Sequence, residues 1–114
     1  MNDCLFCKII KGEIPSAKVF EDDMCYAFKD ISPMAKEHVV IVPKEHFASA
    51  NDINADNVKY VTHIFTVAKD IAKACGIDES GYRIVNNCGK DAGQTVFHIH
   101  FHMLGGEELS DFGA

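Results

Sequence analysis

The sequence is poor in basic residues: Lys and Arg number 11 against 17 Asp and Glu, which gives a formal net charge of −6. A broad nucleic-acid surface needs a basic patch that displaces counterions, so we expect no nucleic-acid partner. The acidic balance is compatible with a small phosphate ligand, because backbone N–H groups and a few imidazoles can hold one phosphate in an acidic protein.

Long apolar runs and a signal peptide are also missing. No stretch approaches the length of a membrane span, and the acidic N-terminus is not followed by the apolar run of a secretory signal. We therefore expect a cytoplasmic protein without a membrane partner, whose five cysteines are thiols or metal ligands rather than disulfides. No repeat, low-complexity tract or linker divides the 114 residues, so we expect one domain over 1–114.

Hydrophobic periodicity and turn residues predict two helices, a helical turn and five strands. The helices are expected at 4–11 and 55–75, and the helical turn at 44–50. The strands are expected at 19–20, 24–28, 38–43, 82–86 and 95–103. Asn54 is the expected cap of the long helix and Gly76 its C-terminal stop. Because strands lie on both sides of a single long helix, this order predicts an α+β fold, an antiparallel sheet with helices packed on one side.

Histidine occupies every second position from His98 through His100 to His102. In a strand, alternate side chains share a face, so three imidazoles line one face and apolar groups the other. The outer pair lies roughly 13 Å apart at about 3.3 Å per residue, too far for one metal to bind all three. A row suits a middle imidazole that attacks while its neighbours hold phosphate oxygens or move a proton. The alternative is a solvated histidine face.

The loop before these histidines is rich in hydrogen-bond donors. Asn87, Gln94 and Thr95 carry donors, and Gly89 and Gly93 let backbone N–H groups approach an anion closely. A donor-rich loop that leads into a histidine row favours an oxyanion or phosphate site over a solvated face.

The pattern at 98–104 resembles the signature of the histidine-triad (HIT) nucleotide-binding proteins. The resemblance extends over nearly the whole chain, through segments 6–10, 13–15, 20–23, 28–33, 41–44 and 93–97. Gly105 and Gly106 resemble the Hint branch, whereas the dinucleoside-polyphosphate hydrolase branch tends to carry proline and arginine there.

The resemblance implies a homodimer whose sheets join into one continuous sheet, and hydrolysis of purine nucleoside phosphoramidates of the AMP-amine type or of acyl-adenylates. It makes His100 the nucleophile that forms a nucleotidyl-histidine, His102 a contact of the α-phosphate and His38 part of a proton relay. The alternatives are a nucleotide-binding adaptor that acts through protein partners and a dinucleoside-polyphosphate hydrolase.

The resemblance also assigns the nucleotide-binding residues. Phosphate or leaving group is expected at Asn87 and Thr95, with Gly93, Gln94 and Val96 nearby. The base pocket is expected from Leu5, Phe6, Ile9, Phe28 and Ile31, and Asp30 is expected to bind the ribose hydroxyls. The alternatives are plain core for the apolar residues and a turn cap for Asp30.

Cys4 and Cys7 form a Cys-x-x-Cys pair, a common half of a tetrahedral zinc site. The resemblance supplies His46 and His98 as the other half, which gives His98 a structural role in place of a chemical one. The alternatives are two buried thiols for the cysteines and a solvated residue at a helix end for His46. A redox pair is less expected, because no thioredoxin-like βαβ pattern surrounds the cysteines.

Three positions depart from the Hint pattern. Thr95 and Phe97 stand where relatives often have serine and tyrosine, and the tail lacks their tryptophan, for which Phe112 is the candidate substitute. His63, within the predicted long helix, is expected to be a surface or partly buried residue without a place in the site.

Overall fold

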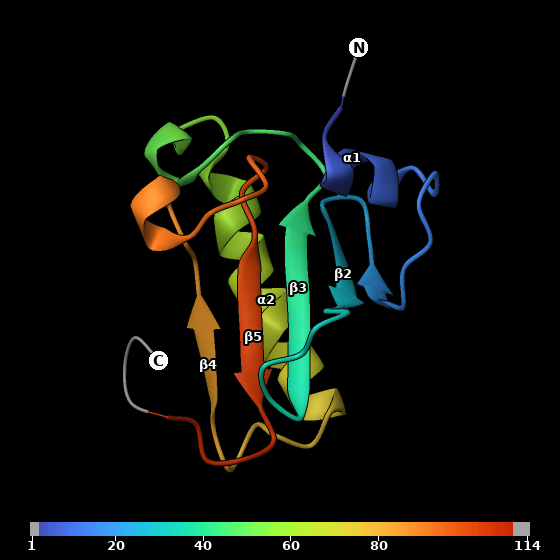
Figure 1. Cartoon of the computed structure of the whole chain (residues 1–114), viewed down its shortest axis with the longest axis vertical. Coiled ribbons are helices and arrows are strands. Elements are labelled where there is room, and N and C mark those ends of the chain that lie inside the picture. The colour runs from blue at the N-terminus through green and yellow to red at the C-terminus, as the bar shows by residue number, and fades with distance from the viewer. Residues whose placement is uncertain (1–2, 111–114) are drawn as a thin grey trace.

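The computed structural model describes residues 3–110, and these form a five-stranded antiparallel sheet in the order β1-β2-β3-β5-β4 (Figure 1). The helical elements are α1 (Leu5–Ile10), η1 (Ala50–Asp52), α2 (Val58–Ala74) and η2 (Lys90–Ala92). The strands are β1 (Lys18–Glu21), β2 (Cys25–Lys29), β3 (Glu37–Pro43), β4 (Tyr82–Val85) and β5 (Phe101–Gly105). The predicted α+β fold, with one long and one short α-helix, is confirmed.

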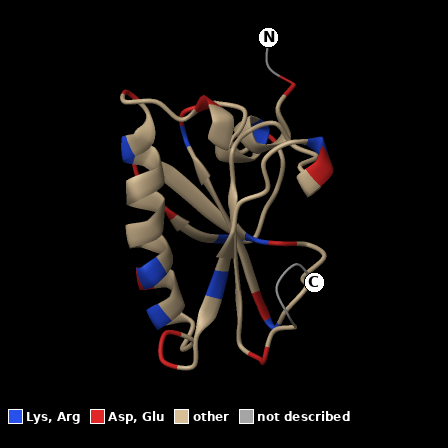
Figure 2. Cartoon of the chain, turned by 90° about the vertical axis from the view of Figure 1, so that its left-hand side faces the viewer, with Lys and Arg blue, Asp and Glu red and all other residues tan. Residues whose placement is uncertain are grey.

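Helices cover both faces of the sheet, so the prediction that they pack on one side is wrong. On β3, Val39 and Ile41 belong to the core beneath α2, whereas Val40 and Val42 belong to a second core beneath α1. The edge-on view places α2 along one face of the sheet (Figure 2). The physical reason lies in β2 and β3, whose residues are apolar at both parities, so each face needs a cover.

The helix α2 begins at residue 58, three residues later than predicted. Asn54 does not cap it: the Asn54 Oδ1 atom accepts the backbone N–H groups of residues 56 and 57 in a turn ahead of the helix. Gly76 follows the helix at a φ of +77°, which agrees with the predicted stop. None of the described helices combines the length and the apolar character that a bilayer crossing requires.

The predicted strand over 95–103 is also wrong in its first half, because β5 starts at Phe101. The preceding backbone finds partners outside the ladder: the Ile99 N–H donates to the Phe47 carbonyl at 2.8 Å, and the Asn86 amide donates to the His100 carbonyl at 2.9 Å. The alternation of side chains nevertheless persists, since Ile99 and Phe101 enter the core beneath α2 while the histidines face α1.

The helical turn predicted over 44–50 is wrong. Residues 44–49 are irregular, and the helical turn in this region is η1, which begins at Ala50. Phe112 lies outside the described residues, and residues 106–110 are irregular. A Cβ atom at Gly105 would lie 2.8 Å from the Ile77 Cδ1 atom and 3.2 Å from the Gly81 carbonyl oxygen, so a larger residue at the end of β5 would displace the Ile77 side chain and crowd the loop after α2.

Candidate active site

The three histidines approach the face of the sheet that α1 covers. His98 and His100 precede β5, and His102 lies within it. The ring centroid of His100 is 4.9 Å from that of Phe6 on α1 and 5.2 Å from that of His102. His38 of β3 continues the row at 5.1 Å from His102. The structure therefore brings together His38, His100 and His102, the three histidines that the resemblance implies for the phosphate chemistry.

His100 has one ring nitrogen without a proton. Its Nδ1–H donates to the His98 carbonyl at 2.8 Å, which assigns the lone pair to Nε2. Burial lowers the pKa of His100, so the ring is neutral near pH 7. Asn86, which sequence reasoning placed only in a strand, fixes the backbone of His100 through its amide. Its position just after β4 and before the donor-rich loop was the available signal.

His38 and His102 form a hydrogen-bonded pair whose tautomers are assigned by their partners. The Met34 backbone N–H donates to His38 Nδ1 at 3.1 Å, so the proton of neutral His38 lies on Nε2. That Nε2–H donates to His102 Nδ1 at 2.9 Å, which places the His102 proton on Nε2. Burial lowers the pKa of His38 and lowers that of His102 to about 4. A hydrogen-bond donor and the lone pair of His100 therefore lie on neighbouring rings.

Asp30 caps the turn, which is the alternative that the sequence left open for this residue. Its Oδ1 atom accepts the Ser32 backbone N–H at 2.8 Å, which is the expected turn cap. Its Oδ2 atom lies 3.5 Å from His38 Nε2, and the side chain is 24 % exposed. One carboxylate oxygen is thus held by the turn, while the other faces the histidine pair in a side chain that is partly open to solvent.

The loop 87–95 differs from expectation at Gln94. The Gln94 side chain is buried and its groups are all used: Nε2 donates to the carbonyls of Ala48 and Val96, and Oε1 accepts the Gly89 N–H. It ties the loop together and is no donor for a ligand. Thr95 is exposed and Asn87 is half-buried, so both side chains are reachable. Gly93, also exposed, adopts the left-handed region at a φ of +88°.

The expected base-pocket residues divide into two sets. Phe6, Ile9 and Phe28 are buried together beneath α1, with the rings of Phe6 and Phe28 5.7 Å apart. Leu5 is 42 % exposed, and Ile31 is 96 % exposed on the turn after Asp30. The first set is therefore a preformed apolar surface, whereas Ile31 packs against nothing in the described part of the chain.

Cys4, Cys7, His46 and His98 converge as predicted, with ligand atoms within 4.8 Å of one another. His98 Nε2–H donates to the Pro43 carbonyl at 2.8 Å, so the Nδ1 lone pair faces the cluster. That Nδ1 atom lies 3.4 Å from Cys4 Sγ, 3.5 Å from Cys7 Sγ and 3.1 Å from His46 Nδ1. Burial lowers the pKa of His98 to about 4 and raises that of Cys4. Two sulfurs and two imidazole nitrogens fit a tetrahedral zinc ion.

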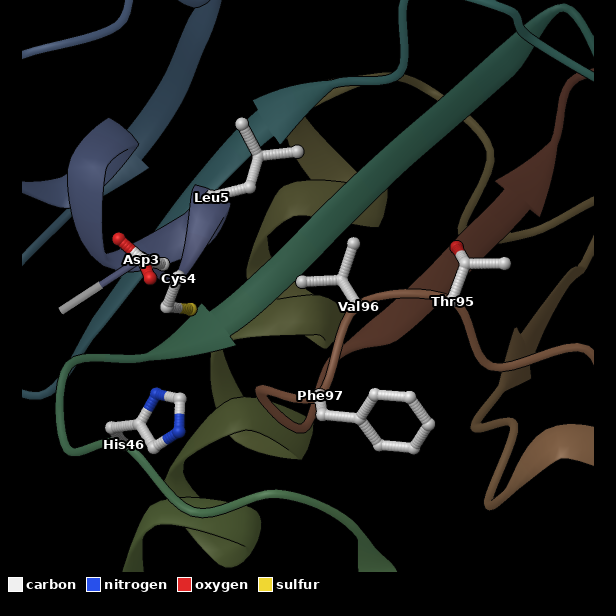
Figure 3. Close-up of a pocket in the computed structure, with 7 residues that line it drawn as sticks. All are labelled: Asp3, Cys4, Leu5, His46, Thr95, Val96 and Phe97. Carbon is white, nitrogen blue, oxygen red and sulfur yellow. The ribbon is translucent and has the colours of Figure 1, made fainter.

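A cavity of about 430 Å³ opens beside this cluster (Figure 3). Its lining residues are Asp3, Cys4, Leu5, His46, Thr95, Val96 and Phe97. It therefore connects the cysteine–histidine cluster to three residues of the expected nucleotide site, whereas His100 and His102 do not line it.

His63 takes no part in either cluster. Its Nε2 atom lies 2.6 Å from Asp22 Oδ2, and the two side chains are about equally exposed at 29 % and 31 %. Burial raises the pKa of Asp22, but hydrogen bonds from His63 and from the backbone N–H groups of Met24 and Cys25 outweigh it and lower the pKa to about 2. This pair joins α2 to the β1–β2 turn, in agreement with the expected partly buried position.

Comparison with known families gives a match to the HIT domain over residues 11–109. The purine nucleoside phosphoramidase of Escherichia coli K12 is 44 % identical over 108 residues, which are 95 % of this chain and 91 % of that protein.

Solved structures agree closely in fold. A histidine triad protein from Clostridium difficile has a TM-score of 0.94 at 48 % identity, with 98 % of this chain and 97 % of that chain covered. A HIT family hydrolase from Clostridium thermocellum has a TM-score of 0.95 at 46 % identity, with coverage of 100 % and 99 %.

Proposed function

This chain belongs to the HIT domain family, and on that premise we propose that it hydrolyses purine nucleoside phosphoramidates through a nucleotidyl-histidine at His100. A nucleotide hydrolase is what the phosphoramidase relative and the HIT family hydrolases indicate. The observation that carries the finer proposal is the pair of tautomers: a lone pair on His100 Nε2 beside a donor on His102 Nε2.

The first step forms one bond and breaks another. The His100 Nε2 lone pair attacks phosphorus, the P–N bond breaks, and the leaving nitrogen takes up a proton because an amide anion is a poor leaving group. In the second step water attacks phosphorus, the P–N bond to His100 breaks, and AMP and one proton are released. The neutral imidazole is thereby restored.

The neighbouring residues bind and orient the phosphate. The His102 Nε2–H donates to a phosphoryl oxygen and withdraws charge as the bond to His100 forms. Asn87, Thr95 and the backbone at Gly93–Val96 supply the remaining donors, with Gln94 holding the loop in shape. The phosphate is thus held by neutral hydrogen-bond donors rather than by charged side chains.

The nucleoside lies against α1. The base packs on the surface formed by Phe6, Ile9 and Phe28, with Leu5 and the exposed Ile31 at its edge. Asp30 accepts hydrogen bonds from the ribose hydroxyls at Oδ2, the oxygen that the turn does not use.

We also propose that Cys4, Cys7, His46 and His98 hold a structural zinc ion. Bound there, the ion cross-links α1 to the connection after β3 and to the residue that accepts the His100 Nδ1–H. It supplies folding free energy rather than chemistry, because all four of its positions are filled by protein.

The edges of the sheet offer a way for two copies of the chain to assemble. The sheet has edges at β1 and β4, whose unpaired backbone groups allow two copies to join into one continuous sheet. We propose such a homodimer, acting in the cytoplasm as the five cysteines suggest.

Mass spectrometry of the intact protein tests the central step. Wild-type protein mixed with a slow adenylate analogue is expected to gain one AMP, and peptide mapping is expected to place it on His100. A His100→Gln variant is the matched control and is expected to gain none. An adduct on another residue, or steady turnover by His100→Gln, overturns the proposal.

A further inference from the structure

The proposed reaction needs a group that gives a proton and regains it. Formation of the nucleotidyl-histidine consumes one proton at the leaving nitrogen, and hydrolysis of that intermediate by water releases one. His100 cannot act as this carrier, because its Nε2 atom is bonded to phosphorus and its Nδ1–H is held by the His98 carbonyl. The carrier must be charged before the first step and neutral between the two.

The His38–His102 pair is adjacent to His100, but in its neutral form it has no proton to spare. Loss of the His102 Nε2 proton would leave an anionic pair. The pair can take up an additional proton only at His102 Nδ1, the atom that now accepts the His38 Nε2–H. The pair that carries this extra proton, and with it a positive charge, is called the loaded pair. His38 cannot move its proton to Nδ1 in response, because the Met34 backbone N–H occupies that nitrogen. The loaded pair therefore needs another acceptor for the His38 Nε2–H.

Asp30 Oδ2, 3.5 Å from His38 Nε2, is in place to be that acceptor. The carboxylate also compensates the charge of the loaded pair, whose His38 side chain is only 3 % exposed. Burial lowers the pKa of both histidines, and the charge of Asp30 acts on each in the opposite direction. The turn hydrogen bond from Ser32 holds the other Asp30 oxygen, which keeps Oδ2 directed at the pair.

We propose that Asp30, beyond binding ribose, is a positioning residue that accepts the His38 Nε2–H and so allows the His38–His102 pair to carry the proton for the leaving group. In the first step the His102 Nε2–H is hydrogen-bonded to a phosphoryl oxygen as the bond to His100 forms, and its proton then passes to the leaving nitrogen as the P–N bond breaks. The Nδ1 proton remains on His102, and after tautomeric exchange with solvent the pair returns to its neutral arrangement. In the second step the proton released from water reloads the pair. The inference rests on the proposed phosphoramidate chemistry.

Measuring wild type and an Asp30 variant on substrates with and without ribose hydroxyls separates this role from ribose binding. Asp30→Asn keeps an oxygen for the Ser32 N–H but turns an amide donor toward His38. The test compares kcat of wild type and variant on an adenosine phosphoramidate and on its 2′,3′-dideoxy analogue. An opposite charge at this range raises a histidine pKa by about one unit or more, so we expect kcat to fall about tenfold on both substrates. A loss confined to the ribose substrate overturns the inference.

The leaving group supplies the second comparison. AMP p-nitrophenyl ester releases a phenolate that needs no proton in the first step, whereas the second step is the same for both substrates. Under single-turnover conditions, which report the first step, Asp30→Asn is therefore expected to slow release of p-nitrophenolate much less than it slows cleavage of the phosphoramidate. That result also shows that the variant is folded. An equal loss on ester and phosphoramidate overturns the inference.

Asp22→Asn is the control, because it removes a carboxylate that faces a histidine outside the site. It is expected to leave both kcat ratios unchanged, and a loss equal to that of Asp30→Asn overturns the inference. Absence of phosphoramidate turnover by the wild type overturns the proposed function, and this inference with it; normal wild-type turnover with a silent Asp30→Asn overturns only the inference.

Discussion

Two clusters beside the triad share a geometry and differ in chemistry. The metal-type cluster contains Cys4, Cys7, His46 and His98, and the relay cluster contains Asp30, His38 and His102. In both, the potential ligand atoms lie within 4.8 Å of one another, and each includes one histidine of the triad. Distances between ligand atoms alone therefore do not distinguish them.

The difference lies at the ring nitrogen that points away from each cluster. His98 donates its outer N–H to the Pro43 carbonyl, so a lone pair faces the cysteines. His38 accepts the Met34 N–H at its outer nitrogen, so a proton faces His102. A metal ligand needs the first arrangement and a proton relay the second. The remote hydrogen bond of an imidazole therefore indicates its role more reliably than the spacing of the residues.

The largest effect is expected at His100, between the two clusters. His100→Ala removes the attacking nitrogen, and we expect phosphoramidate kcat to fall by at least about a thousandfold. AMP affinity, measured by calorimetry, is expected to change much less, because most contacts to the nucleotide remain. Full activity in this variant would refute the nucleophile assignment.

The relay cluster is broken by His38→Ala. This variant leaves His102 Nδ1 without its donor, so the His102 tautomer is no longer set, and we expect kcat to fall on the order of a hundredfold. Zinc content, measured by metal analysis, is expected to stay at the wild-type level. A loss of zinc in His38→Ala would show that the two clusters are not separable.

The metal-type cluster is broken by the double substitution Cys4→Ser with Cys7→Ser. Protein purified without chelator is expected to contain one zinc per chain in the wild type and none in the variant. We expect the variant Tm to be lower by on the order of 10 °C, because metal binding contributes directly to folding free energy. Wild type without stoichiometric zinc would remove the metal assignment.

The smallest effect is expected from the His63–Asp22 pair, a histidine–carboxylate contact outside both clusters. The pKa of Asp22 is lowered to about 2 from 3.8, so its contribution to stability is complete above pH 3.8 and is lost as the pH falls toward 2. Chemical denaturation at several pH values is expected to give a shallower acid dependence in Asp22→Asn. An unchanged acid dependence would mean that the pair contributes nothing measurable.

Local patterns were sufficient for much of the fold. The β-branched run of β3 and the apolar spacing of α2 predict a strand and a helix, because each signal lies within the element itself. The start of β5 was not predictable in this way. Its boundary depends on hydrogen bonds to the Phe47 carbonyl and to the Asn86 side-chain amide, and no periodicity in the sequence records the approach of these residues.

The candidate site divides along the same line. Alternation of His98, His100 and His102 placed three imidazoles toward one face, and the Cys-x-x-Cys spacing brought two sulfurs together. The roles of Asn86, of the Met34 backbone N–H and of the saturated Gln94 amide were missed, because each depends on a contact between separate segments.

The order of residues along the chain determined the α+β class, the elements and the set of side chains that reach the site. The tertiary structure alone decided which imidazole nitrogen carries a proton. Period and composition are properties of neighbouring residues, whereas a tautomer depends on whether a carbonyl or an N–H group from another segment meets the ring. At His98 that group is a carbonyl from the end of β3, and at His38 it is an N–H from the turn before β3.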